Sequence, residues 1–153
     1  LIKDEFSRIM SLKDGSKKMS KSEPSDLSRI NLSDGENQII NKIKKAKTDP
    51  LPLPSNKEEL NKRPEAKNLV GIYSSLTNST LDDSIERFSG NNFSDFKEEL
   101  SQALVDKIRP ISSEIKKLLE ESSYLDKILE EGRENANEIA SKKIKKIHEI
   151  MGF

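Results

Sequence analysis

The pentapeptide Lys18-Met19-Ser20-Lys21-Ser22 places two lysines three residues apart, with hydroxyl groups between and after them. Because a lysine acts on phosphate as a compact point charge on a flexible stem, this pattern suits a polyanion such as a triphosphate. Residues 13–32 show no sustained hydrophobic period and contain several small polar residues, which predicts an exposed loop. The apolar run Ile9-Met10-Ser11-Leu12 predicts a strand-like segment that leads into this loop.

Other segments accompany the pentapeptide in a fixed order along the chain. They are Arg8–Leu12, Glu23–Pro24, Lys47–Pro50, Asn68–Leu76 and Ile108–Ile111. The pentapeptide resembles the second signature of class I aminoacyl-tRNA synthetases, a loop that holds ATP phosphates. The ordered series as a whole is similar to tryptophanyl-tRNA synthetases over essentially the full chain. Tyrosyl-tRNA synthetases have a similar loop, but the segments at 68–76 and 108–111 favour the tryptophanyl family.

The resemblance implies a nucleotide-binding fold before the loop, with a His-x-Gly-His type signature. The only histidine here is His148, and the chain starts at Leu1. We therefore expect the C-terminal part of a longer, Rossmann-type class I synthetase, with the present residues mainly α-helical. In this interpretation residues 1–33 end the catalytic domain, and residues 34–153 form a C-terminal helical bundle that binds the tRNA anticodon.

The resemblance also implies a reaction, the ATP-dependent activation of tryptophan to tryptophanyl-adenylate and its transfer to tRNA(Trp). Lys18 and Lys21 would be catalytic, with Lys21 acting on the leaving pyrophosphate. The implied ATP contacts are Ile9, Lys18, Met19, Ser20, Lys21 and Ser22. Mg²⁺ would share the phosphate charge in the whole enzyme, although no carboxylate here stands out as its ligand. Residues 1–153 alone are expected to be inactive.

The partners that the resemblance implies are tryptophan, ATP, tRNA(Trp) and a second copy of the whole enzyme. Candidate tRNA contacts are Lys142, Lys145 and Lys146, on the charged flank of the last predicted helix. We expect a cytoplasmic, bacterial-type enzyme, and an organellar origin stays open. No stretch approaches the ~20 apolar residues of a membrane span. The alternative is a stand-alone helical RNA-binding or interaction module whose lysine-rich loop is incidental.

The composition limits the classes of protein and the kinds of site that the chain could represent. Hydrophobic residues make up 32% and charged residues 35%, which suits a small helical assembly with broad solvated faces. The net charge is zero, so no global charge points to nucleic acid, but residues 1–48 carry an excess of positive charge around the pentapeptide. The absence of cysteine excludes disulfides and thiolate metal sites.

Four helices are predicted between residues 33 and 121. Ser33 and Glu36 are predicted to form a capping box at the start of the first helix. The last turn of this helix is basic, with Lys42, Lys44, Lys45 and Lys47. This basic end is either solvated or lies near tRNA or phosphate. A proline-rich connection at 48–64 leads to a second helix, with Tyr73 as a core aromatic residue. A second capping box, Thr80 and Asp83, begins a helix that Gly90 ends. A long helix runs over 95–121, with a kink or break at Pro110.

Two further helices are predicted at the C-terminus. A short one begins with Ser123 as its cap and ends at Gly132. The last runs over 134–151, with an apolar stripe facing inward and His148 in a structural or exposed position.

Overall fold

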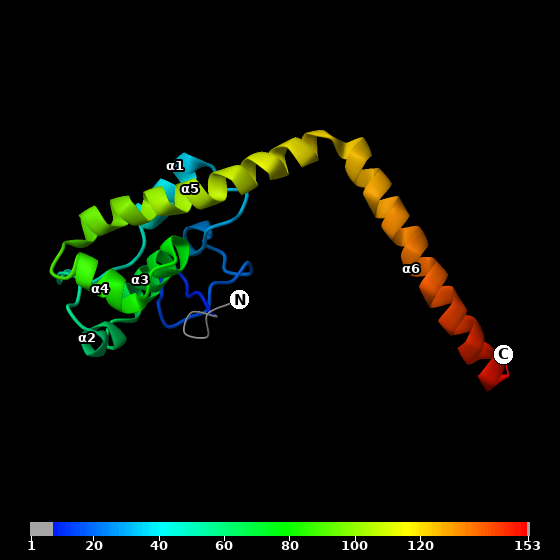
Figure 1. Cartoon of the computed structure of the whole chain (residues 1–153), viewed down its shortest axis with the longest axis horizontal. Coiled ribbons are helices and arrows are strands. Elements are labelled where there is room, and N and C mark those ends of the chain that lie inside the picture. The colour runs from blue at the N-terminus through cyan, green and yellow to red at the C-terminus, as the bar shows by residue number, and fades with distance from the viewer. Residues whose placement is uncertain (1–7, 153) are drawn as a thin grey trace. The chain divides into compact units, whose positions relative to one another are not determined.

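A computed structural model describes residues 8–152 of the chain, and these residues fall into two compact units that divide between Ser112 and Ser113. The described residues are mainly α-helical, as predicted (Figure 1). The helices are α1 (Glu36–Lys44), α2 (Lys57–Asn61), α3 (Pro64–Thr77), α4 (Leu81–Phe88), α5 (Phe93–Glu120) and α6 (Ser122–Met151). A 3-10 turn, Asp26–Ser28, lies between the lysine-rich loop and α1.

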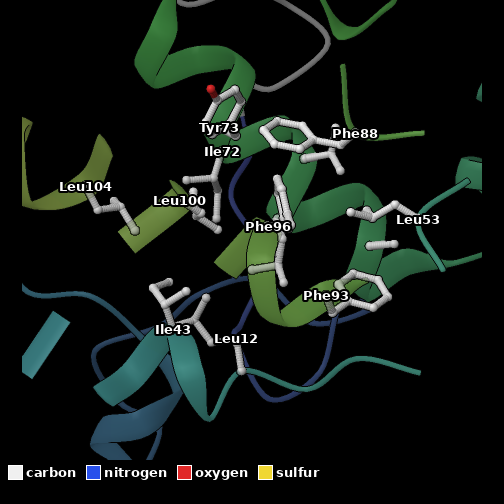
Figure 2. Packing of buried hydrophobic residues seen from close by; sticks show 14 of the residues in the cluster. Leu12, Ile43, Leu53, Ile72, Tyr73, Phe88, Phe93, Phe96, Leu100 and Leu104 are labelled. Carbon is white, nitrogen blue, oxygen red and sulfur yellow. The ribbon is translucent and has the colours of Figure 1, made fainter. Parts of the chain in front are cut away.

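The hydrophobic core lies in the first unit and joins the lysine-rich segment to helices α1, α3, α4 and α5. Three aromatic rings form its centre, with Phe88 4.9 Å from Tyr73 and 4.8 Å from Phe96 between ring centroids (Figure 2). Both pairs meet edge to face, the arrangement that aromatic quadrupoles favour. Tyr73 is therefore a core residue, as predicted. Leu12 reaches the same core from the N-terminal segment (Figure 2).

The start of α1 differs from the prediction. Its N-cap is Gly35, not Ser33, and the Gly35 N–H donates to Oε1 of Gln38 over 2.8 Å. The reason is that the preceding residue, Asp34, is buried in a contact with Lys42 and fixes where the helix begins. The capping box of α4 is as predicted, with Thr80 and Asp83 each accepting a hydrogen bond from the other's backbone N–H.

The proline-rich connection contains a helix that the sequence did not indicate. It is α2, whose N-cap Asn56 accepts a hydrogen bond from the Glu59 N–H. A helix of five residues is too short to show a hydrophobic period. Pro64 begins α3, as predicted, at the first helical position where its missing N–H has no consequence.

The two long helices decide three predictions. Of the kink or break predicted at Pro110, the break is wrong, because α5 continues through this residue: a proline removes one backbone donor while the remaining hydrogen bonds continue the helix. α6 is a single helix across Gly132, because a mid-helix glycine weakens a helix by only about 1 kcal/mol. The prediction that an apolar stripe of the last helix faces inward is also wrong, because none of the residues of α6 is buried. A 3.6-residue period shows which face could be buried, but burial needs a second surface.

Candidate phosphate-binding loop

The lysine-rich loop begins from a short pairing of two backbone segments. Met10 and Lys18 form an antiparallel bridge. The Ser11 N–H donates to the Lys17 carbonyl over 2.8 Å, and the Met19 N–H donates to the Ile9 carbonyl over 3.0 Å. The predicted strand-like lead is therefore confirmed in the form of one bridge. We call residues 9–19 the base of the loop and residues 20–25 its tip.

A tight turn closes the base. Asp14 Oδ1 accepts hydrogen bonds from the N–H of Ser16 over 3.1 Å and from its hydroxyl over 2.6 Å. These bonds lower the pKa of the Asp14 carboxyl. Gly15 lies against the start of α3, where an added Cβ would be 2.5 Å from the carbonyl carbon of Pro64 and 2.6 Å from the Glu65 nitrogen. Only a residue without a side chain allows this approach.

The tip presents the predicted site residues to solvent. Ser20, Lys21 and Ser22 are exposed, and within the tip the Ser22 N–H donates to the Ser20 hydroxyl over 3.2 Å. Lys18, on the adjoining end of the base, is exposed as well. Among the ion pairs of residues 8–152, none includes Lys18 or Lys21. Both ammonium groups are thus available to an anionic ligand.

The two apolar site candidates lie beside each other. The hydrogen bond from the Met19 N–H to the Ile9 carbonyl brings their backbones together across the base. Ile9 is 45% exposed, whereas Met19 is partly buried and packs against the core. Pairing therefore joins a residue before the turn to the lysine pentapeptide, an association that sequence spacing did not show.

A buried ion pair anchors the chain just after the tip. Lys42 Nζ lies 2.6 Å from Asp34 Oδ2 and 2.7 Å from Asp26 Oδ2. The side chains of Lys42 and Asp34 are only 4% and 5% exposed, so the two charges compensate each other away from water. The hydrogen bond from Lys42 lowers the pKa of the Asp26 carboxyl. Lys42 therefore does not belong to the solvated basic end predicted for α1.

Arg29 ties the tip to this anchor. Its Nη1 donates to the Glu23 carbonyl over 2.8 Å, and its Nη2 lies 3.1 Å from Asp26 Oδ1. Asn31 bridges Asp26 and Asp34 with its side-chain amide. The segment that follows the pentapeptide is therefore held by charged and polar side chains that no motif in the sequence singled out.

A further contact that the sequence analysis missed comes from α3. Asn68, which is 8% exposed, accepts a hydrogen bond from the Met10 N–H over 2.9 Å and donates one to the Met10 carbonyl over 2.8 Å. Lys47 adds an ion pair to Glu65 over 2.8 Å, and its backbone N–H donates to the Leu12 carbonyl. Neither contact could be read from spacing, because the partners lie far apart along the chain.

The three candidate tRNA contacts lie on α6, and all are exposed. Lys142 Nζ is 2.7 Å from Glu138 Oε1, one turn earlier on the helix. Lys145 lines a shallow hollow with Ile144 and His148. His148 is exposed, one of its two predicted positions.

A hollow of the first unit lies between α1 and the first turns of α5, and no residue of the lysine loop lines it. Lys97 Nζ donates to the Ala46 carbonyl there over 2.7 Å, and burial lowers the pKa of this amine. Within residues 8–152, no group of three or more His, Cys, Asp or Glu side chains could hold a metal ion. In that same part of the chain, no helix is long and apolar enough to cross a membrane.

The lysine loop and its surroundings match known proteins. The family model for tRNA synthetases class I (W and Y) matches residues 3–109. The tryptophan–tRNA ligase of Agrobacterium fabrum is 51% identical over 146 residues, which are 95% of this chain and 41% of that protein. The ligase of Caulobacter vibrioides is 44% identical over 153 residues, 100% of this chain and 44% of that protein.

A solved structure agrees with these relatives. The crystal structure of tryptophanyl-tRNA synthetase from Mycoplasma pneumoniae matches with a TM-score of 0.63 and 26% identity, over 75% of this chain and 36% of that chain. The resemblance to tryptophanyl-tRNA synthetases is thereby confirmed, and the chain spans about two fifths of the length of the curated relatives above. By its match over residues 3–109, this chain belongs to the tRNA synthetases class I (W and Y).

Proposed function

We propose that this chain supplies the ATP-phosphate loop and the tRNA-binding helices of a tryptophan–tRNA ligase. The activity of the whole enzyme would be the ATP-dependent formation of tryptophanyl-adenylate and its transfer to tRNA(Trp). The observation that carries the proposal is the pair Lys18 and Lys21, exposed and free of carboxylate partners on a loop anchored at both ends. The stand-alone helical module is not favoured, since the relatives named above are tryptophan–tRNA ligases.

The chemistry follows from the charges. When the carboxylate of tryptophan attacks the α-phosphate, negative charge grows on the phosphates and the leaving pyrophosphate. Positioned cations that meet this charge lower the barrier. We assign this role to Lys18 and Lys21, with hydroxyl donors from Ser20 and Ser22. Ile9 and Met19, joined across the base, would offer apolar surface to the adenine.

Mg²⁺ is expected with ATP in the whole enzyme. Among residues 8–152, no group of three or more His, Cys, Asp or Glu side chains could hold a metal ion, and no single carboxylate here is assigned to Mg²⁺. No step here is therefore assigned to the ion, and the role of this chain toward the phosphates rests on its two lysines.

The division of labour that we propose has residues 1–33 completing the catalytic domain and residues 34–153 contacting the anticodon. Residues 1–7 and 153 lie outside the described part of the chain. We further propose a homodimer of the whole enzyme and a cytoplasmic location, as the resemblance to tryptophanyl-tRNA synthetases implies.

The test uses a joined enzyme, in which this chain replaces the matching part of the Agrobacterium fabrum ligase. In it, Lys21→Ala should slow adenylate formation by about 100- to 1,000-fold, equivalent to roughly 2.7–4 kcal/mol, and leave tryptophan affinity unchanged. Pre-steady-state adenylate formation at saturating ATP measures this rate. Lys21→Arg should restore it only in part, because a planar fork replaces a compact ammonium.

Lys13→Ala is the matched control, because Lys13 is an exposed lysine of the same loop base without an ion pair. Its rate should equal that of the parent enzyme. If Lys21→Ala forms adenylate at the parental rate, the catalytic role of the loop is wrong.

The tRNA contact has a separate test. Reversing the charge of Lys142, Lys145 and Lys146 to Glu should weaken tRNA(Trp) binding and preserve adenylate formation, since these lysines are exposed on α6. Lys127→Glu, also exposed on α6, is the control. Equal tRNA affinity of the triple variant and the parent at low salt would reject these three contacts.

A further inference from the structure

Residues 9–12 of the base have two edges of backbone groups, and the two edges meet different partners. In an antiparallel pair, successive residues direct their backbone groups to opposite edges. Ile9 and Ser11 face residues 17–19 through their hydrogen bonds. Met10 and Leu12 therefore face the other edge, where an unpaired strand would leave its N–H and C=O groups without partners.

Side chain and backbone groups from three places occupy that second edge. The Leu12 N–H donates to the Ser28 carbonyl over 2.9 Å, and the Leu12 carbonyl accepts from the Lys47 N–H over 2.8 Å. Both backbone groups of Met10 bond to Asn68, whose side-chain amide accepts a hydrogen bond from the Met10 N–H and donates one to the Met10 carbonyl. One amide side chain thus replaces a neighbouring strand.

The geometry requires an amide of this length. The Oδ1 of Asn68 faces a donor and its Nδ2 faces an acceptor, at 2.9 and 2.8 Å. An aspartate would keep the acceptor and place a second oxygen against the Met10 carbonyl. Because Asn68 is buried, the Met10 carbonyl and the new carboxylate oxygen would each lack a hydrogen bond, and water would not supply one.

The same helix contacts the base a second time. Gly15 lies against the backbone of Pro64 and Glu65 at the first turn of α3. Pro64 and Asn68 are four residues apart and therefore share one face of the helix. α3 thus holds the base at its turn and at the residue that pairs with Lys18.

We propose that Asn68 is a positioning residue of the phosphate loop: by holding both backbone groups of Met10, it sets where the paired Lys18 and the following Lys21 stand. This inference rests on the proposed function. Asn68 would not touch ATP and would act through the lysines. Small displacements of a catalytic group are expensive, since a shift of about 1 Å can slow a reaction by about 100-fold.

In the joined enzyme, Asn68→Asp should slow adenylate formation by up to about 100-fold and leave tryptophan affinity unchanged. In a Lys21→Ala background the same substitution should have an effect at least about threefold smaller, because the contribution of a misplaced Lys21 is gone and only the effect through Lys18 remains. A purely structural role predicts equal effects in both backgrounds. Ser74→Ala is the control, since Ser74 is a buried polar residue of α3 that bonds to Ser79 and not to the loop.

Hydrogen exchange supplies a readout that does not depend on catalysis. Asn68→Asp and Asn68→Ser should speed exchange at the amides of Ser11 and Met19, with no change at Ser84 in α4. Unchanged exchange at Ser11 and Met19 would overturn the inference. Because two variants are measured, this outcome can be read even if one of them folds poorly. A parental adenylate rate in Asn68→Asp, beside a slow Lys21→Ala enzyme, would overturn the positioning role alone. A parental rate in Lys21→Ala would overturn both this role and the proposed function.

Discussion

The base and the tip of the lysine loop are neighbours in sequence and opposites in structure. The base is held by backbone pairing, by Asn68 and by the close approach of Gly15 to α3. The tip exposes Lys21 and its serines, and the segment that follows it is anchored by Lys42. A loop that stabilises a transition state with charge needs defined ends, while a loop that admits ATP and releases products needs an accessible tip.

The difference also teaches where stability resides. The anchors bury charges and backbone groups that are satisfied only by their partners, so their loss should destabilise the folded chain. Side chains of the tip make few contacts, so their replacement should affect ligand binding and rate more than stability. The predictions below test this distinction, from the largest expected effect on stability to the smallest.

Lys42→Ala should lower the free energy of unfolding by about 3–5 kcal/mol, because it leaves Asp34 buried without a compensating charge. Urea unfolding of this chain, followed by near-ultraviolet circular dichroism from the buried Tyr73, measures the change. Lys45→Ala, at the exposed end of the same helix, should change the stability by less than about 0.5 kcal/mol. Equal effects of the two substitutions would contradict the role of Lys42 as an anchor.

Gly15→Ala should destabilise the chain by about 1–3 kcal/mol, because the new methyl group would meet the backbone of Pro64 and Glu65. Gly132→Ala should have the opposite sign and stabilise α6 by about 0.5–1 kcal/mol, since nothing lies within 4 Å of the added Cβ. Thermal unfolding of the two variants beside the parent measures both. A Gly15→Ala chain as stable as the parent would show that the base does not depend on this close approach.

Acid should weaken the anchors before it affects the tip. Hydrogen bonds from Ser16, Lys42 and Lys47 lower the pKa values of Asp14, Asp26 and Glu65 respectively. A carboxyl with a lowered pKa contributes stability that is present above its ordinary value, 3.8 for Asp and 4.5 for Glu, and is lost as pH falls through the folded value. The free energy of unfolding should therefore decrease as pH is lowered from about 5 to about 3.

Lys47→Met provides the control for this pH dependence. It removes the first cause of the lowered pKa of Glu65, so the loss of stability on acidification should become smaller. Urea unfolding at several pH values compares the two chains. A steeper loss of stability in Lys47→Met than in the parent would contradict the assignment.

Part of the fold could be predicted because the signals are local. The capping box of Thr80 and Asp83, the start of α3 at Pro64 and the lead at Ile9 each depend on residues a few positions apart. The lysine pentapeptide could likewise be identified as a phosphate-binding candidate from charge and spacing alone. The family followed from the order of such segments, and the matches confirm it.

The rest was decided by contacts between distant residues. Lys42 resembles its basic neighbours in the sequence, but the fold buries it between two carboxylates. Asn68 reaches Met10 across 58 positions, and no period or spacing indicates such a pair. The apolar stripe of α6 shows the converse, since its residues are exposed despite their pattern.

The sequence by itself determined the helical class, the starts of α3 and α4, and a pair of lysines whose spacing suits a phosphate, because propensity and capping act within about one turn. The tertiary structure alone decided which of the lysines is buried, which amide holds the base of the loop and which apolar face is covered. Those outcomes depend on partners brought together by folding, and on whether each desolvated group finds one.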